Sequence, residues 1–225
     1  MCGRFVVTPN PETIARFFDV DDITVEDQGA NYNVAPTDSI YGVAEHHGQR
    51  KLGAFRWGLI PWWSKEKGPL HINARAESVA SKATFRDAFA RRRCLIPADG
   101  FYEWESTADG KQPFFIHSID GEMLAMAGIW SRWTDPATED SLSTAAIVTT
   151  KATGQVANLH ERMPVILPRS LWDAWLNRDL RDPGEVAELI QPISDLEYHP
   201  VSKAVNRVQN NFPECVMPVD LSTDV

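Results

Sequence analysis

The sequence opens with MCGRF, which places a cysteine immediately after the initiator methionine. Removal of a methionine that precedes a small residue is expected, and it would leave Cys2 with a free α-amine two carbons from its thiol. A 1,2-aminothiol condenses with an aldehyde to an imine, and addition of the thiol to the same carbon closes a five-membered thiazolidine. The unperturbed α-amine titrates near ~8 and the thiol near ~8.5, so both nucleophiles are partly available at neutral pH. The alternative interpretation makes Cys2 a small buried hydrophobic residue at the start of a strand.

Three further stretches place polar side chains where the apolar pattern does not require them. GFYEWE (100–105) sets Glu103 between two aromatic residues in a strand that we expect to be internal, and burial there would raise its pKa, as a general acid requires. LHERMPVIL (159–167) sets His160 just before an apolar strand. NARAE (73–77) alternates Asn73, Arg75 and Glu77, which would point to one side of an extended segment. Each stretch also has a structural interpretation: Glu103 could pair with a buried arginine, and His160 could be a core imidazole with satisfied hydrogen bonds.

Aromatic and basic side chains suited to nucleic acid gather in short segments. RWGLIPWW (56–63) presents Trp57, Trp62 and Trp63 around a rigid proline, as a stacking surface would. The formal net charge is −9, yet residues 75–94 carry six basic residues against two acidic ones. A basic surface on an acidic body is suited to binding phosphates. The alternatives are that the tryptophans belong to the core, and that the arginine triplet 91–93 is the solvated end of a helix.

Composition limits the class of protein. The 225 residues are 43% hydrophobic and 24% charged, and we expect a single domain over residues 1–225, with a core at about 2–210 and a short C-terminal tail. No apolar run reaches the ~20 residues that a membrane span needs, and no signal peptide is apparent. Three cysteines without a CxxC spacing are typical of a reducing cytosol and argue against a zinc site. We therefore expect a cytoplasmic monomer that uses no metal and no cofactor.

The elements that must position these residues are mixed in type. A strand is expected at 3–8, a hairpin at 39–45 and 51–57, and further strands at 94–98, 100–105, 112–118, 123–130 and 143–149. Asn10 and Pro11 begin a short helix, Thr84 begins one that extends to Arg93, and later helices start at Ser170 and Pro183. This pattern predicts an α+β fold: a single compact domain with a curved, mostly antiparallel, barrel-like sheet and peripheral helices.

Taken in order, the motifs resemble those of one family. The strings are MCGRF, YNVAP, WGLIPWW, NARAE, RRCLIPADGFYEW, KQPFFI, IVTTKA and LHERMPVIL, and the match runs from residue 2 to about residue 210. Together they are similar to the SOS-response-associated peptidase family, the abasic-site-processing proteins. The resemblance is specific because several motifs occur in a fixed order in one chain.

The resemblance implies that the protein senses abasic sites in single-stranded DNA and forms a covalent DNA–protein crosslink there, with weak abasic-site lyase activity and autoproteolytic removal of Met1 as further expectations. Cys2 would form the thiazolidine with the ring-opened sugar, Glu103 would shuttle protons during imine formation, and His160 would act as acid and base in opening the sugar ring. Asn73 would orient the sugar. The other implied contacts are phosphate binding by Arg4, Arg75, Arg86 and Arg162, and a wall for base stacking made of Pro36, Trp62 and Trp63.

Other functions stay open at the level of the sequence. Class II glutamine amidotransferases also begin with Met-Cys-Gly and use the α-amine as base for the thiol, but they need an Asn-Gly pair that this sequence lacks. A cysteine peptidase built from Cys2, His160 and Glu103 is a second alternative, with removal of Met1 as its expected action. A single-stranded DNA-binding module in which Cys2 is incidental is the third.

Overall fold

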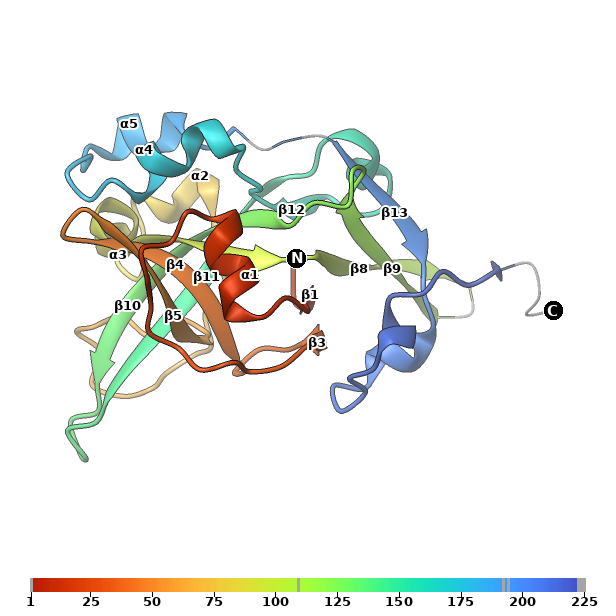
Figure 1. The fold of residues 1–225 in the computed structure, drawn as a ribbon, viewed down its shortest axis with the longest axis horizontal. Helices are drawn as coiled ribbons and strands as arrows, with labels where there is room; N and C mark the ends of the chain where they lie inside the picture. Colours follow the sequence, from red (N-terminus) through yellow and green to blue (C-terminus); the bar gives the residue numbers. More distant parts are fainter. Residues whose placement is uncertain (1, 109, 192, 194, 222–225) are drawn as a thin grey trace.

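The computed structural model describes residues 2–108, 110–191, 193 and 195–221 (Figure 1). Within these residues, five strands pair as a closed ring in the order β5–β4–β7–β10–β11, with β11 returning to β5. Their bounds are Ser39–His46 (β4), Gln49–Trp57 (β5), Arg93–Ala98 (β7), Leu124–Thr134 (β10) and Ser141–Lys151 (β11). Neighbouring strands are antiparallel except at the closing pair, where Thr144 and Ala145 lie parallel to Arg56 and Trp57. The predicted α+β fold with a barrel-like, mostly antiparallel core is confirmed.

Short strands extend this barrel at its edges. β2 (Asp22–Ile23) pairs with β5, β12 (Arg162–Pro164) pairs with β11, and β6 (Asn73–Arg75) continues along the edge of β11 that β5 also uses. The connection between β5 and β6 therefore starts and ends on the same edge of one strand. This connection carries the exposed tryptophans described below.

A second sheet lies beside the barrel and holds the chain's first strand. Its order is β13–β9–β8–β1–β3, and its bounds are Phe5–Val7 (β1), Asn31–Val34 (β3), Gly100–Thr107 (β8), Gly110–Ser118 (β9) and Leu196–Pro200 (β13). Phe5 lies opposite Phe101, so the residues just before β1 are next to the middle of β8. Glu103 lies two residues beyond Phe101 on that strand. The register therefore brings the N-terminal segment and the GFYEWE motif together.

The helices begin where local capping chemistry directs. In α1 (Pro11–Phe17), Asn10 Oδ1 accepts a hydrogen bond from Thr13 N at 3.0 Å, and in α5 (Pro183–Glu188) Asp182 caps the first turn. These two starts are confirmed. The helix expected from Thr84 to Arg93 is shorter than predicted. It is α3, which runs from Arg86 to Arg91 and has no side-chain cap. The remaining helices are α2 (Ala76–Val79) and α4 (Trp172–Leu176), with short 3₁₀ turns at Gly154–Asn158 (η1), Arg169–Leu171 (η2), Lys203–Asn206 (η3) and Pro213–Cys215 (η4).

Arg93 leaves the helix and becomes a buried structural residue of β7. The residue is 3% exposed, and its guanidinium donates to five carbonyl oxygens in the last turns of α3 and α4 and the loop after α4, those of Phe89, Ala90, Trp175, Asn177 and Leu180. Arg91 and Arg92 both pair with Asp87 on α3. The triplet is therefore the end of a helix followed by a structural arginine, and it does not form a common surface for phosphates.

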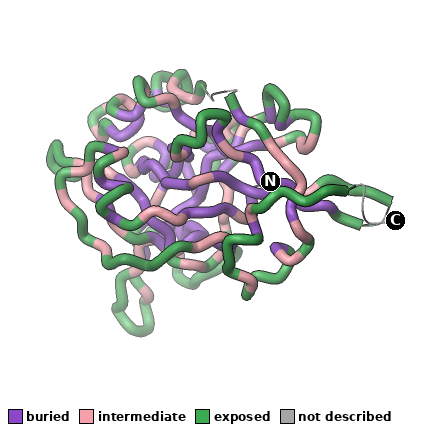
Figure 2. Tube along the Cα trace, turned by 45° about the vertical axis from the view of Figure 1, so that its right-hand side comes forward, coloured by how far each residue is buried: buried purple, intermediate pink, exposed green. Residues whose placement is uncertain are grey.

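One large cluster of buried hydrophobic residues joins the barrel strands to α1, α4 and α5, and a smaller one joins β1, β8 and β9 to the C-terminal segment; Figure 2 colours the buried stretches purple. Cys2, Cys94 and Cys215 are all free and buried. Residues beyond 210 also pack against the fold: Val201 bridges to Pro218, and Asn211 Oδ1 accepts a hydrogen bond from Tyr32 N at 2.8 Å. No helix within the described ranges is long and apolar enough to cross a membrane.

Candidate active site

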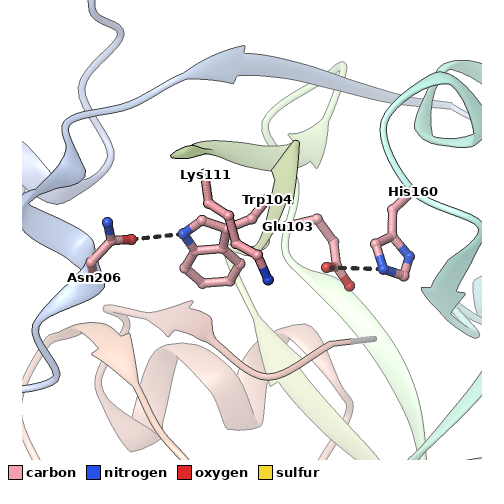
Figure 3. A pocket seen from close by; sticks show the side chains of 5 residues that line it. All are labelled: Glu103, Trp104, Lys111, His160 and Asn206. Carbon is pink, nitrogen blue, oxygen red and sulfur yellow. Dashed lines mark hydrogen bonds and ion pairs between the residues drawn. The ribbon is translucent and has the colours of Figure 1, made fainter. Parts of the chain in front are cut away.

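A cavity of about 410 Å³ lies beside the middle of β8, where two of the predicted residues, Glu103 and His160, meet (Figure 3). It is lined by Glu103 and Trp104 of β8, Lys111 of β9, His160 from the loop between η1 and β12, and Asn206 at the end of η3. In Figure 3 the Glu103 carboxylate points toward the imidazole of His160, and the amine of Lys111 lies between the indole and the carboxylate. Lys111 and Asn206 carry no sequence signal that would have selected them.

Glu103 and His160 form a directed pair. Glu103 is 3% exposed, and its Oε2 lies 3.8 Å from His160 Nε2. Burial raises the pKa of the Glu103 carboxyl group, and the charge of His160 opposes that effect. His160 Nδ1 lies 2.9 Å from the backbone nitrogen and 3.1 Å from the carbonyl oxygen of Arg162, and these contacts hold the ring with Nε2 toward Glu103. The pair can therefore exchange a proton with a group in the cavity.

Cys2 lies directly behind this pair. In the chain that carries Met1, Cys2 is fully buried, and burial together with the Glu103 carboxylate raises the pKa of its thiol. Its carbonyl oxygen accepts a hydrogen bond of 2.7 Å from Asn73 Nδ2. Asn73 thus holds the N-terminal segment through its amide nitrogen. Its Oδ1 is buried and has no hydrogen-bond partner among the described residues, which leaves an acceptor for a further donor.

The wall of the cavity opposite His160 is built by the C-terminal segment. Trp104 Nε1 donates to Asn206 Oδ1 at 2.7 Å, which fixes the indole over the cavity. Arg4 Nη1 donates to the carbonyl of Val205 at 2.9 Å and to Asn33 Oδ1 at 2.7 Å. Arg4 is a predicted phosphate ligand. Its Nη1 instead connects the N-terminal segment to that wall.

A second, polar hollow of about 350 Å³ lies on the other side of His160. It is lined by Arg75, Glu77, Lys151, Glu161 and Arg162. Arg75 ends β6 and is exposed, as a phosphate ligand must be. The extended segment predicted for 73–77 stops at Arg75, because α2 begins at Ala76 and places Glu77 in its first turn. Glu77 therefore does not share a strand face with the other two residues.

Pro36, Trp62 and Trp63 lie on two turns that Trp57 joins. The Trp57 N–H donates to the carbonyl of Asp38, and the Thr37 N–H donates to the carbonyl of Trp57, each at 2.9 Å. These two bonds hold a turn that has Pro36 at its second position and Thr37 at φ +84°. A β-branched residue in the left-handed region is strained, so this turn is held by its contacts. The chain then continues to Pro61–Ser64, a turn at whose tip Trp62 and Trp63 are 58% and 51% exposed. Trp57 itself is fully buried, as the core interpretation predicts.

Arg86 is separate from both hollows. It is exposed at the first position of α3 and is not among the residues that line either of them. Its role in binding phosphate stays a prediction. Among the residues that the structure describes, no group of three or more histidine, cysteine or acidic side chains could hold a metal ion.

The sequence matches the family described as SOS response associated peptidase (SRAP) over residues 1–208. The chain belongs to this family. Its relatives include abasic site processing protein YoqW of Bacillus subtilis, 38% identical over 96% of this chain and 99% of YoqW. Abasic site processing protein YedK of Escherichia coli is 33% identical over 97% of this chain and 100% of YedK. The chicken protein HMCES is 35% identical over 77% of this chain and 59% of HMCES.

Solved structures share the fold. A crystal structure of a protein from Bacteroides thetaiotaomicron aligns with a TM-score of 0.85 at 24% identity, covering 97% of this chain and all of that one. A phage-related protein from Bordetella bronchiseptica aligns with a TM-score of 0.71 at 27% identity, covering 90% of this chain and 95% of that one. The membership supports a function connected with abasic sites in DNA.

Proposed function

We propose that this protein captures abasic sites in single-stranded DNA as a covalent thiazolidine formed with Cys2 once Met1 has been removed. The observation that carries the proposal is the grouping of four residues from positions scattered over the sequence: Glu103 and His160 line one cavity as a pair, Cys2 is buried within the electrostatic reach of Glu103, and Asn73 binds the Cys2 carbonyl. Relatives named as abasic site processing proteins support the choice of substrate.

The steps follow from the groups present. The α-amine of Cys2 attacks C1′ of the ring-opened deoxyribose, and loss of water leaves an imine. The thiol sulfur then adds to the same carbon, and its proton passes to the ring nitrogen through Glu103, which closes the thiazolidine. Because the sulfur and the imine belong to one residue, an effective molarity of ~10⁵ M is plausible. An abasic site is mostly a closed hemiacetal, so His160 is assigned to protonating the ring oxygen.

The state of the thiol supports imine formation as the first step. A cysteine hydrolase needs a thiolate, usually beside an imidazolium. In the chain that carries Met1, burial and the Glu103 carboxylate both favour the neutral thiol, and His160 Nε2 faces Glu103. Those conditions suit a nucleophilic amine followed by a thiol that gives up its proton during ring closure. An imine that does not close would acidify the C2′ proton, and weak lyase activity follows from the same site.

The surroundings support a single strand as the partner. The hollow with Arg75 and Arg162 supplies cations beside the cavity, and Trp104 supplies an indole held in place on the opposite side. Exposed Trp62 and Trp63 offer further stacking surface of the kind that tolerates any base. We expect the protein to act on DNA as a cytoplasmic monomer.

The test is a gel with abasic single-stranded DNA, run for the wild type and Cys2→Ala. The wild type should give a heat-stable, slowly migrating adduct, and Cys2→Ala should give none. Intact-mass analysis of the wild type should show loss of Met1 and no acetyl group. A retained or blocked amine, or an adduct that persists in Cys2→Ala, would refute the mechanism. Release of a hydrolysed small substrate without an adduct would favour a hydrolase.

A further inference from the structure

The hollow beside the cavity contains an arginine whose charge is already matched. Arg162 Nη1 and Nη2 lie 2.5 and 3.0 Å from the two carboxylate oxygens of Glu77, a bidentate pair. The Arg162 side chain is only 12% exposed, whereas that of Glu77 is 55% exposed. The fork that a phosphate would occupy is therefore filled by a carboxylate, and the carboxylate is the partner that faces solvent.

A guanidinium group donates two parallel hydrogen bonds to two oxygens of a carboxylate or of a phosphate in the same planar geometry. A backbone phosphodiester also carries the same single negative charge as an ionised carboxylate. We propose that Glu77 is an exchangeable gate on Arg162, which occupies the guanidinium in the free protein and gives way to a backbone phosphate of the bound strand. The identity of that strand rests on the proposed function, whereas the anion exchange rests on this pair alone.

The contacts of the two partners indicate which of them moves. Arg162 also donates from Nη2 to the carbonyl of Thr149 at 2.7 Å, and its backbone pairs with Lys151 on β11. These contacts hold the arginine in place when the carboxylate leaves. Glu77 lies in the first turn of α2, a four-residue helix without a side-chain cap. Its side chain is 55% exposed, so it can rotate into solvent once its two bonds to Arg162 are exchanged for a phosphate.

Exchange avoids the cost of an uncompensated charge. A nearly buried arginine without a counter-ion is strongly destabilising, so a site that waits for DNA needs a temporary anion. Arg75 and Lys151 line the same hollow and supply the remaining positive charge. The backbone N–H of Arg162 meanwhile keeps its 2.9 Å hydrogen bond to His160 Nδ1. The imidazole therefore stays oriented toward Glu103 before and after the strand arrives.

The gate is tested with Glu77→Gln, and Glu161→Gln is the matched control. Both substitutions remove one negative charge from the same hollow, but only Glu77→Gln removes the carboxylate that is paired with Arg162. Affinity for an undamaged, fluorescein-labelled single strand is measured by anisotropy on the full chain. Glu77→Gln should bind about three- to tenfold more tightly than the wild type, and Glu161→Gln less than about twofold. Thermal unfolding checks that both variants are folded.

A second measurement does not depend on DNA. Inorganic phosphate is titrated while the Arg162 side-chain N–H resonances are followed by NMR, and Glu77→Gln should respond at lower phosphate concentration than the wild type. If Glu77→Gln matches Glu161→Gln in both measurements, the effect is net charge and the gate is overturned. If Glu77→Gln binds more weakly, the carboxylate orients Arg162 in the complex, and the gate is again overturned. A positive phosphate titration with no DNA binding by the wild type would support the gate and contradict the proposed function.

Discussion

Replacing Glu103 with glutamine separates catalysis from stability at this site. The substitution preserves shape but removes the carboxylate that faces His160 Nε2 across 3.8 Å. Loss of one proton-transfer group costs about 10²–10⁴-fold in rate, which is roughly 2.7–5.5 kcal/mol of transition-state stabilisation. We therefore expect single-turnover crosslinking to slow by that factor.

The same substitution should stabilise the fold at neutral pH. Because burial raises the pKa of Glu103 in the folded state, its ionisation destabilises the fold as pH rises from the ordinary carboxyl pKa through the raised one. Glutamine does not ionise. Glu103→Gln should thus raise the free energy of unfolding and the Tm at pH 7–8, and the gain should shrink toward zero as pH falls through the ordinary carboxyl range.

The assay compares wild type, Glu103→Gln and His160→Gln between about pH 5 and pH 9. As pH falls, the wild-type crosslinking rate should decrease at pH values above the ordinary pKa of a carboxyl group. Glu103→Gln should not show this decrease. His160→Gln should also slow crosslinking, and should reduce strand cleavage and reversal. Wild-type rates for both variants across the range would refute both catalytic roles. Impairment of His160→Gln alone would make Glu103 a structural partner of the imidazole.

Four further predictions test other parts of the molecule. Cys2→Ser should form an imine but no durable ring, because oxazolidines open readily in water, so its adduct should survive heating only after borohydride reduction; a heat-stable adduct without reductant would remove the thiol from the mechanism. Binding of single strands should weaken with a log–log salt slope near −3, about −0.7 for each of roughly four phosphate contacts, and a flat slope in anisotropy titrations would contradict the arginine contacts. Arg93→Lys should lower the free energy of unfolding in urea by about 3 kcal/mol, since an ammonium group cannot reach five carbonyl oxygens; a loss below about 1 kcal/mol would mean that other donors replace it. Asn73→Ala should slow crosslinking about tenfold by releasing the Cys2 carbonyl, equivalent to one hydrogen bond of ~1.4 kcal/mol, and an unchanged rate would reduce Asn73 to a structural tether.

Sequence alone was sufficient where the physics is local. Asn10 and Pro11 begin a helix because the cap bonds only three residues ahead. The turn expected between residues 45 and 51 is confirmed, since His47 and Gly48 both adopt positive φ, +54° and +77°, as a two-residue hairpin loop requires. The motif order was also enough to indicate the family. Each of these inferences depends on residues a few positions apart, or on their identities alone.

The tertiary structure decided which charged groups meet. The sequence did not indicate that Arg93 would be buried against carbonyls, or that Glu77 would turn onto a helix and fill the fork of Arg162. It also gave no sign that Asn206 would hold Trp104 across a separation of 102 residues. Arg4 reaches Val205 across 201 residues. An arginine or a carboxylate has the same local propensities whether it faces DNA, a carbonyl or an opposite charge. Its partner is chosen when strands from distant parts of the chain come into register, because a buried or half-buried charge must be matched by whatever the packed fold places beside it.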